Sequence, residues 1–188
     1  IANVLDGLEV GPDLSVLNIT GDVDLQVEPD IGFPNGFITT IDASDLEANL
    51  FGDDFFTYSS AVDGIVTVLG AEGFNYLELN SSFTSLTDFD VFTQAGDDII
   101  FTSSGDDLVF ADSGDNTVVT FDGVDIVVTE GGEDSIVTGS GSDQIDSGAG
   151  DDTINSGADS DFVEAGSGDN QVFAESGNNT VISLEGSD

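Results

Sequence analysis

The feature that most constrains this chain is a glycine that recurs at every ninth position through its second half. The series contains no insertion and misses one position, where Asp159 stands in place of glycine. Its members are Gly96, Gly105, Gly114, Gly123, Gly132, Gly141, Gly150, Gly168, Gly177 and Gly186. A fixed period of this kind is typical of a solenoid, in which each repeat packs only on its neighbours.

Two other residue types keep fixed distances from each position of the series. An acid or its amide follows at the second position after it, at Asp98, Asp107, Asn116, Asp125, Asp134, Asp143, Asp152, Asp161, Asn170, Asn179 and Asp188. An aliphatic residue follows two positions after that, at Ile100, Val109, Val118, Val127, Ile136, Ile145, Ile154, Val163, Val172 and Val181. Turn glycine, oxygen ligand and buried aliphatic at constant offsets indicate strands joined by turns that can hold a metal ion.

The nine-residue unit also predicts the size of one coil. Each unit has room for a turn of about six residues and a strand of about three. Strands that reverse direction at every unit then stack on the strands two units away, so that one coil consists of two units. The aliphatic residues of alternate units form two facing rows. We therefore predict an all-β fold, a β-solenoid with 18-residue coils over residues 93–188.

Residues 1–92 differ from this second half in composition. They contain all three Pro and nine of the 14 Phe. Alternating apolar residues at Val23, Leu25 and Val27, and at Leu77 and Leu79, predict half-buried strands. Residues 44–47 match a capping box, which favours a short helix, but a strand edge fits them equally well. We predict two domains: a β-rich, Phe-rich segment at 1–92, either a cap or an irregular solenoid, and the repeat-bearing β-solenoid at 93–188.

Charge restricts the partners. The chain has 39 Asp and Glu and no Lys, Arg or His, so it cannot neutralise a nucleic acid and cannot form an internal salt bridge between side chains. Its partner is expected to be a cation. There is no Cys for a disulfide, and no apolar run is long enough to span a membrane.

A core one side chain thick buries too little apolar surface to support the fold alone, so we expect metal ions to contribute. Carboxylates and backbone carbonyls are hard oxygen ligands that suit Ca²⁺. The turns fall on two edges, six on one and five on the other, which leaves at most nine inter-coil sites. Filling all nine would change the net charge from −39 to −21.

Segments such as SGAGDDTIN (147–155) and TGSGSDQID (138–146) resemble the nonapeptide GGxGxDxUx of the RTX (repeats-in-toxin, haemolysin-type) calcium-binding family. The resemblance covers residues 93–188 and implies a parallel β-roll, Ca²⁺ between the turns, type I secretion and folding triggered by extracellular calcium. Residues 38–50 are similar to segments that precede such repeats in bacterial surface-layer and adhesin-like proteins.

The resemblance also implies the metal ligands and their quality. The second repeat position, glycine in the family, is glycine only at Gly139, Gly148, Gly157 and Gly166, so we expect the best sites within residues 139–170. Asn brings no charge, and the Asn turns should bind weakly or stay empty. The candidate metal-site residues are the acids and amides named above, with Gly96, Gly105, Gly114, Gly123, Gly132, Gly139, Gly141, Gly148, Gly150, Gly157, Gly166, Gly168 and Gly177.

The residues beside each buried aliphatic are expected to point outward, and in the first three coils several are apolar. They are Ile99, Phe101 and Val119 on one face, and Leu108, Phe110, Ile126 and Val128 on the other, whereas later coils carry Gln144, Asp146, Thr153 and Asn155. Either the Phe-rich segment covers these faces or they are a self-assembly surface. The last repeat stops at Asp188, which suggests a longer chain or cover from another copy.

Without His, Cys, Lys or Arg, catalysis would have to rest on carboxylate pairs, and we predict no enzymatic site. The sequence favours a secreted, self-associating structural module at the bacterial cell surface, stiffened by calcium, in a surface layer, adhesin or filament. The alternative is the C-terminal secretion and folding tail of a larger toxin or hydrolase.

Overall fold

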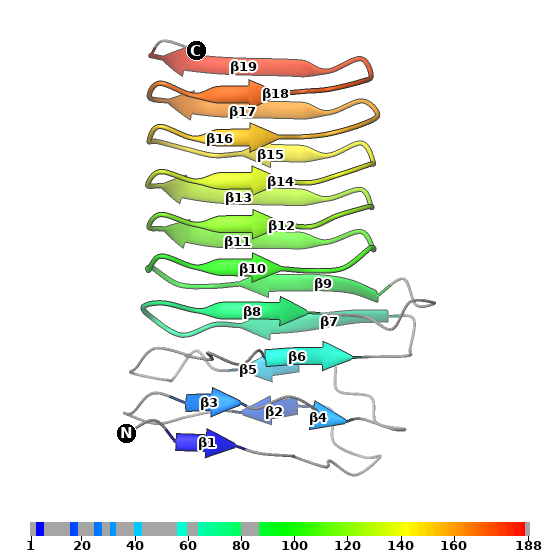
Figure 1. Ribbon diagram of the computed structural model, residues 1–188, viewed down its shortest axis with the longest axis vertical. Helices are drawn as coiled ribbons and strands as arrows, with labels where there is room; N and C mark the ends of the chain where they lie inside the picture. The colour runs from blue at the N-terminus through cyan, green and yellow to red at the C-terminus, as the bar shows by residue number, and fades with distance from the viewer. Residues whose placement is uncertain are drawn as a thin grey trace.

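The described strands stack in one column. The computed structural model describes residues 3–5, 16–18, 25–27, 31–32, 40–42, 56–59, 64–79 and 87–186. Strand β1 lies near one end of the column and β19 at the other (Figure 1). The described part of the chain contains no helix, and hence none that could cross a membrane.

Two parallel sheets form the two sides of the column. The first has the order β18-β16-β14-β12-β10-β8-β6-β4 and the second β19-β17-β15-β13-β11-β9-β7-β5-β2, while β1 and β3 pair separately. The first sheet comprises β4 (Ile31–Gly32), β6 (Phe56–Ser59), β8 (Tyr76–Leu79), β10 (Ile99–Phe101), β12 (Thr117–Val119), β14 (Ser135–Val137), β16 (Thr153–Asn155) and β18 (Gln171–Phe173). The second comprises β2 (Val16–Asn18), β5 (Thr40–Asp42), β7 (Gly64–Leu69), β9 (Thr87–Phe92), β11 (Leu108–Ser113), β13 (Ile126–Gly131), β15 (Gln144–Asp146), β17 (Phe162–Ser167) and β19 (Thr180–Glu185). The separate pair is β1 (Asn3–Leu5) and β3 (Leu25–Val27).

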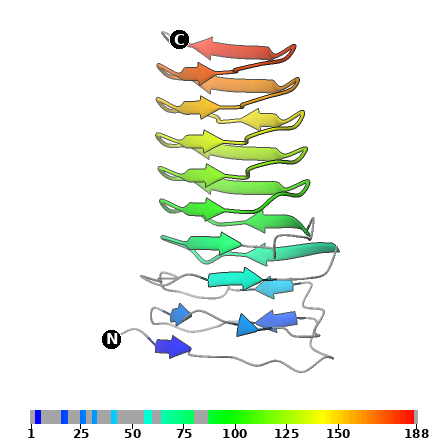
Figure 2. The ribbon, with the colours of Figure 1, turned by 45° about the vertical axis from the view of Figure 1, so that its right-hand side comes forward.

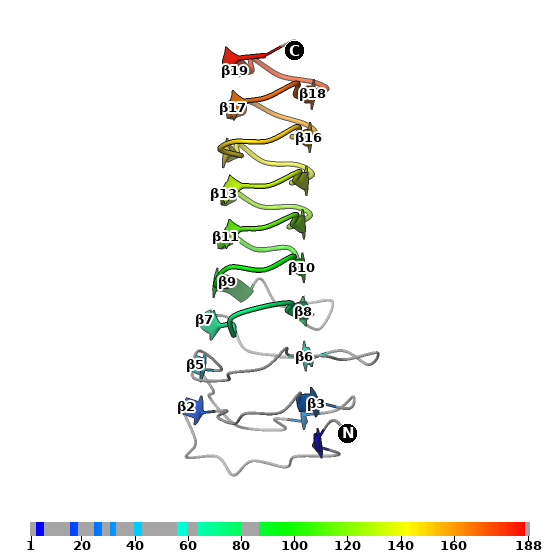
Figure 3. The same cartoon turned by 90° about the vertical axis from the view of Figure 1, so that its left-hand side faces the viewer.

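The register confirms the predicted coil. Ile100 pairs with Val118, Val118 with Ile136, and Ile136 with Ile154, so that each partner lies two units further along the chain. The second sheet keeps the same step from Val109 to Val127 onward. Figure 3 shows the two sheets face to face, with the chain crossing between them at every unit. The all-β solenoid with 18-residue coils, predicted from the nine-residue period, and the parallel β-roll that the resemblance implies are therefore confirmed.

The core lies between the sheets and is one side chain thick from each side. The predicted inward residues are fully buried, with no exposed surface at Ile100, Val118, Ile136 and Ile154 on one side and Val109, Val127, Ile145 and Val163 on the other. Val172 is partly buried, and Val181 is 46% exposed because β19 is the last strand of its sheet.

Strands from residues 1–92 extend the same two sheets. Asp90 pairs with Leu108 at the regular two-unit step, whereas Thr67 pairs with Asp90 and Thr40 with Thr67 over longer stretches of chain. The column in Figure 2 is accordingly continuous, but its earlier coils are longer and less regular. The predicted strands appear as β3 and β8, while residues 44–47 lie outside the described residues. The division into two domains at 92/93 stays a prediction.

The outward faces differ from the prediction in one respect. We expected exposed apolar side chains to be concentrated in the first three coils, but Phe162 and Phe173 in later coils are 39% and 53% exposed. They stand directly beside the inward Val163 and Val172, at the same flanking positions as the outward residues of the earlier coils. The described strands of residues 1–92 continue the column along its axis, and they do not lie across the faces of the later coils.

The turn glycines are required by close approach of one coil to the next. At Gly141, φ is +143°, and a Cβ atom would lie 1.5 Å from the carbonyl oxygen of Gly123 in the preceding coil. Asp159, which replaces a glycine of the series, keeps the left-handed conformation with φ of +85°. The backbone conformation of the turn is thus set by the stack, even where the residue is not glycine.

We expect Gly141→Ala to destabilise the protein by at least the roughly 1–3 kcal/mol that overpacking costs, because the new methyl group collides with backbone that cannot move aside. Thermal unfolding at saturating calcium measures the change. The matched control is Gly131→Ala, where the nearest atom to the new Cβ is 3.3 Å away. Equal losses in the two variants would contradict this account of the turn.

Candidate metal centres

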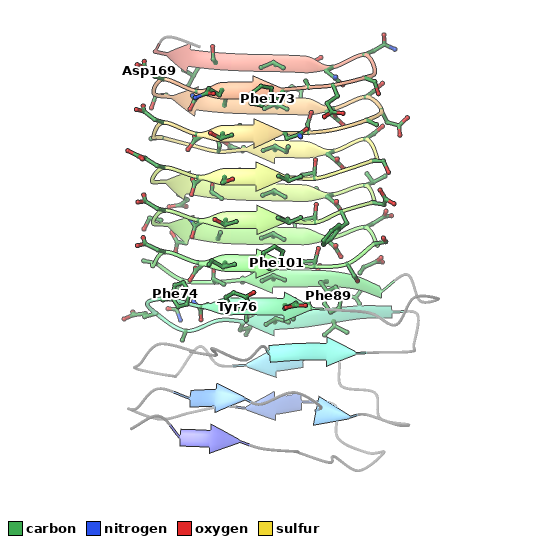
Figure 4. The ribbon with its side chains drawn as sticks, viewed as in Figure 1. Phe74, Tyr76, Phe89, Phe101, Asp169 and Phe173 are labelled. Carbon is green, nitrogen blue, oxygen red and sulfur yellow. The ribbon has the colours of Figure 1, made fainter. Side chains whose placement is uncertain are left out.

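The acids and amides of the repeats lie inside the turns along two edges of the column. The first edge carries Asp98, Asn116, Asp134, Asp152 and Asn170, and the second carries Asp107, Asp125, Asp143, Asp161 and Asn179. Figure 4 shows oxygen-bearing side chains at both edges, with Asp169 marking the first. All except Asn179 are at most 3% exposed. Asp188 lies outside the described residues.

One oxygen of each side chain ties neighbouring coils together. The backbone N–H of Asp107 donates to Oδ1 of Asp125 at 2.9 Å, and that of Asp125 donates to Oδ1 of Asp143 at 2.9 Å. The N–H of Asp134 donates to Oδ1 of Asp152 in the same way on the first edge. Each of these carboxylates therefore accepts a hydrogen bond from a backbone N–H of the preceding coil. The carboxylates of successive coils form a row along the edge.

The second carboxylate oxygen is the unusual one. Within the described part of the chain, Oδ2 of Asp98, Asp134, Asp143, Asp152 and Asp161 is buried and has no hydrogen-bond partner. Buried polar atoms are normally hydrogen-bonded, and an orphaned carboxylate oxygen is costlier than a neutral one. A row of such atoms in a chain without Lys, Arg or His fits a cation that the atoms could ligate.

Electrostatics in the turns oppose ionisation. Burial, partly offset by hydrogen bonds from Thr102 and the backbone, raises the pKa of Asp107 to about 8. Burial likewise raises the pKa of Asp98 and of Asp125 to about 6. Facing carboxylates add to the effect, since the charge of Asp143 raises the pKa of Asp125 further. Without a cation, the turns favour a proton on these carboxylates.

The ligands available at one place are two carboxylates and backbone carbonyls. In the described ranges, no group of three Asp, Glu, His or Cys side chains converges on one point. An ion between two coils would be held by one carboxylate from each, with backbone carbonyl oxygens of the turns completing the set. This all-oxygen donor set fits Ca²⁺, which accepts mixed carboxylate and carbonyl ligands in flexible geometry.

The candidate glycines occupy the bends of these turns. Positive φ angles occur at Gly96, Gly114, Gly123, Gly132, Gly139, Gly141, Gly148, Gly150, Gly157, Gly166, Gly168 and Gly177. Gly105 has no such angle, but its N–H donates to the carbonyl of Asp122 in the next coil. At the second repeat position the left-handed conformation persists without glycine, with φ of +53° at Asp112 and +72° at Phe121.

The structure adds Asn75, which was not predicted from the sequence, to the residues of the turns. Gly73, Asn75 and Leu77 have the same offsets as the later repeats, and Asn75 is fully buried. Its backbone N–H donates to Oδ1 of Asp98 at 2.7 Å, so among the described residues it is the first turn of the same edge. The signal was present in the triplet, but the longer, irregular step from Asn75 to Asp98 hid it.

A second row of acids, exposed on the turns, also links neighbouring coils. The carboxylates of Asp97 and Asp106 accept the backbone N–H groups of Asp115 and Val124 from the following coil, each at 2.9 Å. These exposed acids precede the buried ones directly in sequence, and they bond in the opposite direction along the column. The paired acids of Asp97-Asp98 and Asp106-Asp107 could have indicated this double role.

Comparison with known proteins adds a family to this geometry. The sequence profile of the RTX calcium-binding nonapeptide repeat, in four copies, matches residues 90–118, 119–154 and 155–188, together more than half of the chain. The chain belongs to the RTX calcium-binding repeat family. This confirms the resemblance noted in the sequence and the calcium-binding nature of its repeats. No curated protein and no solved structure matches the RTX chain.

The raised pKa values predict how the metal-free RTX coils respond to pH. A carboxyl whose pKa is raised on folding stabilises the fold below its unfolded pKa near 4, and this stabilisation is lost as the pH rises through the folded pKa. With folded pKa values of about 6 for Asp98 and Asp125 and about 8 for Asp107, the loss falls between about pH 4 and pH 8.

We therefore expect calcium-free protein to gain strand structure on acidification from pH 8 to pH 5.5, measured by circular dichroism in metal-free buffer. Saturating calcium should remove most of this pH dependence, because a bound cation favours the ionised carboxylates. A calcium-free protein that is more stable at pH 8 than at pH 5.5 would contradict this interpretation.

Proposed function

We propose that this chain is a secreted calcium-binding structural module, a building block of a bacterial cell-surface assembly such as a surface layer, adhesin or filament. The observation that carries the proposal is the row of buried Oδ2 atoms that have no hydrogen-bond partner in the described turns. The chain supplies no basic side chain to compensate them, so an external cation must do so.

The residues that would hold calcium are the facing carboxylates of successive coils. Asp107, Asp125, Asp143 and Asp161 would act on the second edge, and Asp134 and Asp152 on the first. Bound calcium would neutralise these carboxylates and link each coil to the next. The turn glycines let the coils approach closely enough for two carboxylates to share one ion.

A location outside the cell follows from the same energetics. A net charge of −39 opposes any compact state unless cations compensate it, and millimolar calcium is an extracellular condition. RTX repeat proteins are typically secreted, which supports export of this chain in an unfolded, calcium-free state and folding outside. Type I secretion is the route that the family resemblance implies.

We propose a structural and not an enzymatic role. The sequence offers no His, Cys, Lys or Arg to serve as nucleophile, base or electrophile. The buried carboxylates are already committed to inter-coil hydrogen bonds through Oδ1. Their remaining oxygens point to metal binding, which rigidifies the column and does not require a substrate.

Exposed apolar side chains support self-association. Phe110 and Ile126 lie on neighbouring strands of the second sheet and are 37% and 38% exposed, and Phe110 stacks on Phe92 at 5.5 Å between ring centroids. Val137 and Phe173 are exposed on the first sheet. Apolar surface on both faces of a rigid column is suited to lateral packing of one copy against another.

We expect the protein in millimolar calcium to show full strand structure by circular dichroism and to sediment as assemblies. Excess EGTA should convert it to an expanded monomer, because the buried carboxylates then repel one another without compensation. The double variant Phe110→Ser, Ile126→Ser should stay folded in calcium but associate at least ten-fold more weakly, about 1.4 kcal/mol.

The control is Gln144→Ser, which changes a polar residue of the same sheet and should leave assembly unchanged. Full strand structure in EGTA would overturn the calcium proposal. Discrete wild-type monomers in millimolar calcium would overturn self-association and would favour the alternative, a secretion and folding tail of a larger toxin or hydrolase.

A further inference from the structure

The buried acids and amides of the turns differ in the residue five positions before them. In every nine-residue unit where the turn carries Asp, that residue is Thr or Ser, and in every unit where it carries Asn, that residue is Ala. Thr93, Thr102, Thr120, Thr129, Thr138, Ser147, Ser156 and Ser183 precede Asp, whereas Ala111, Ala165 and Ala174 precede Asn116, Asn170 and Asn179. The irregular turn at Asn75 has Gly70 in this place. The two positions therefore change together.

In two of the Asp turns the hydroxyl donates to the carboxylate. Oγ1 of Thr102 donates to Oδ2 of Asp107 at 2.5 Å, and Oγ1 of Thr120 donates to Oδ2 of Asp125 at 2.6 Å. In the other described Asp turns, Oδ2 has no hydrogen-bond partner although it is buried. An Asp turn thus presents at most one donor to Oδ2, and often none.

In the Asn turns the Asn side chain itself bonds to the backbone carbonyls of the turn, and we call such a turn closed. Nδ2 of Asn170 donates to the carbonyl of Ala165 at 2.6 Å, and Nδ2 of Asn179 donates to the carbonyl of Ala174 at 2.8 Å. Nδ2 of Asn116 donates to the carbonyl of Gly114 at 2.9 Å. The amide therefore supplies hydrogen-bond donors to the backbone carbonyls that surround it.

At Asn75 an amide group likewise bonds to the oxygen atoms around it, and these come from two coils. Its Nδ2 donates to the carbonyls of Ala71 and Gly73 and to Oδ1 of Asp98, at 2.9, 3.0 and 2.9 Å. Two carbonyls and a carboxylate from the next coil are an oxygen set of the kind that a calcium ion binds. Here a neutral amide group bonds to all three.

Hydrogen-bonding chemistry explains why Asp occurs with Thr or Ser and Asn occurs with Ala. Asn and Asp have nearly the same shape, but the amide nitrogen donates where Oδ2 accepts. In the turns of Asn170 and Asn179 the amide nitrogen donates to the backbone carbonyl of the alanine itself, so no hydroxyl is needed at that position. A carboxylate facing the same carbonyls needs a hydroxyl or a cation, since acceptors alone cannot satisfy one another.

We propose that this residue pair determines which turns bind calcium: carboxylate–hydroxyl turns take ions, and amide–alanine turns are closed by the Asn side chain and take none. The proposal rests on the calcium-binding function proposed above. It places ions only where two carboxylates of successive coils face each other, at Asp107/Asp125, Asp125/Asp143, Asp143/Asp161 and Asp134/Asp152.

The described turns should therefore hold four ions, three in a row on the second edge and one on the first. This is fewer than the nine places that the spacing alone allows. On the first edge Asn116 and Asn170 flank the pair of Asp134 and Asp152, so the ion there is isolated between two closed turns.

Counting calcium ions that stay bound through gel filtration tests the proposal, with calcium chloride as the only added ligand. The variant Ala111→Thr, Asn116→Asp should retain two more ions than the wild type, because the new carboxylate faces both Asp98 and Asp134. Thr already occupies the equivalent place one coil before and after, at Thr93 and Thr129, so the variant is expected to fold. The reverse variant, Thr138→Ala with Asp143→Asn, should retain two fewer ions.

Two single variants serve as controls. Asn116→Asp alone should gain the same sites with roughly ten-fold lower affinity in calcium titration, since it lacks the supporting hydroxyl. Asn178→Asp adds the same charge at an exposed turn position and should gain no retained ion.

A wild type that retains nine ions, or an Ala111→Thr, Asn116→Asp variant that retains no more than the wild type, would overturn the pairing proposal while leaving calcium binding intact. A wild type that retains no calcium and keeps its strand structure in EGTA would instead overturn the proposed function itself.

Discussion

The structure depends on how the negative charge of its buried carboxylates is compensated. These carboxylates form a row along each edge of the column. Asp107, Asp125, Asp143 and Asp161 follow one another at each coil, nearly free of exposed surface, in a chain that has no basic side chain. Their burial raises the pKa values of Asp107 and Asp125 and leaves several carboxylate oxygens without a donor. A proton or a cation has to fill this role, and at neutral pH calcium is the better candidate.

The same acids also define the turns. A buried carboxylate such as that of Asp125 accepts a backbone N–H from the preceding coil. An exposed acid such as Asp106, which directly precedes the buried Asp107 in sequence, accepts a backbone N–H from the following coil. Both sheets then keep the regular two-unit step, and the core needs only one layer of aliphatic residues on each side. The fold and the candidate metal centres therefore depend on the same contacts, because the hydrogen bonds that align the coils also align the metal ligands.

The sequence predicted the coil length, the inward aliphatics and the acids of the turns, because each follows from a strict period. It did not predict that Oδ1 and Oδ2 have different roles, since side-chain hydrogen bonding depends on the direction of stacking. It missed Asn75, where a longer coil breaks the period, and it misjudged the outward Phe162 and Phe173. The regular period therefore revealed the column, whereas irregular coils and surfaces required the structure.

The most direct test of the central claim is the position of calcium in crystals of the calcium-loaded protein, located by anomalous X-ray diffraction. The account predicts peaks between successive carboxylates, at Asp107/Asp125, Asp125/Asp143 and Asp143/Asp161 on one edge and at Asp134/Asp152 on the other. It predicts none at the turns of Asn116 and Asn170. A fully folded column whose edges show no anomalous peak would contradict it.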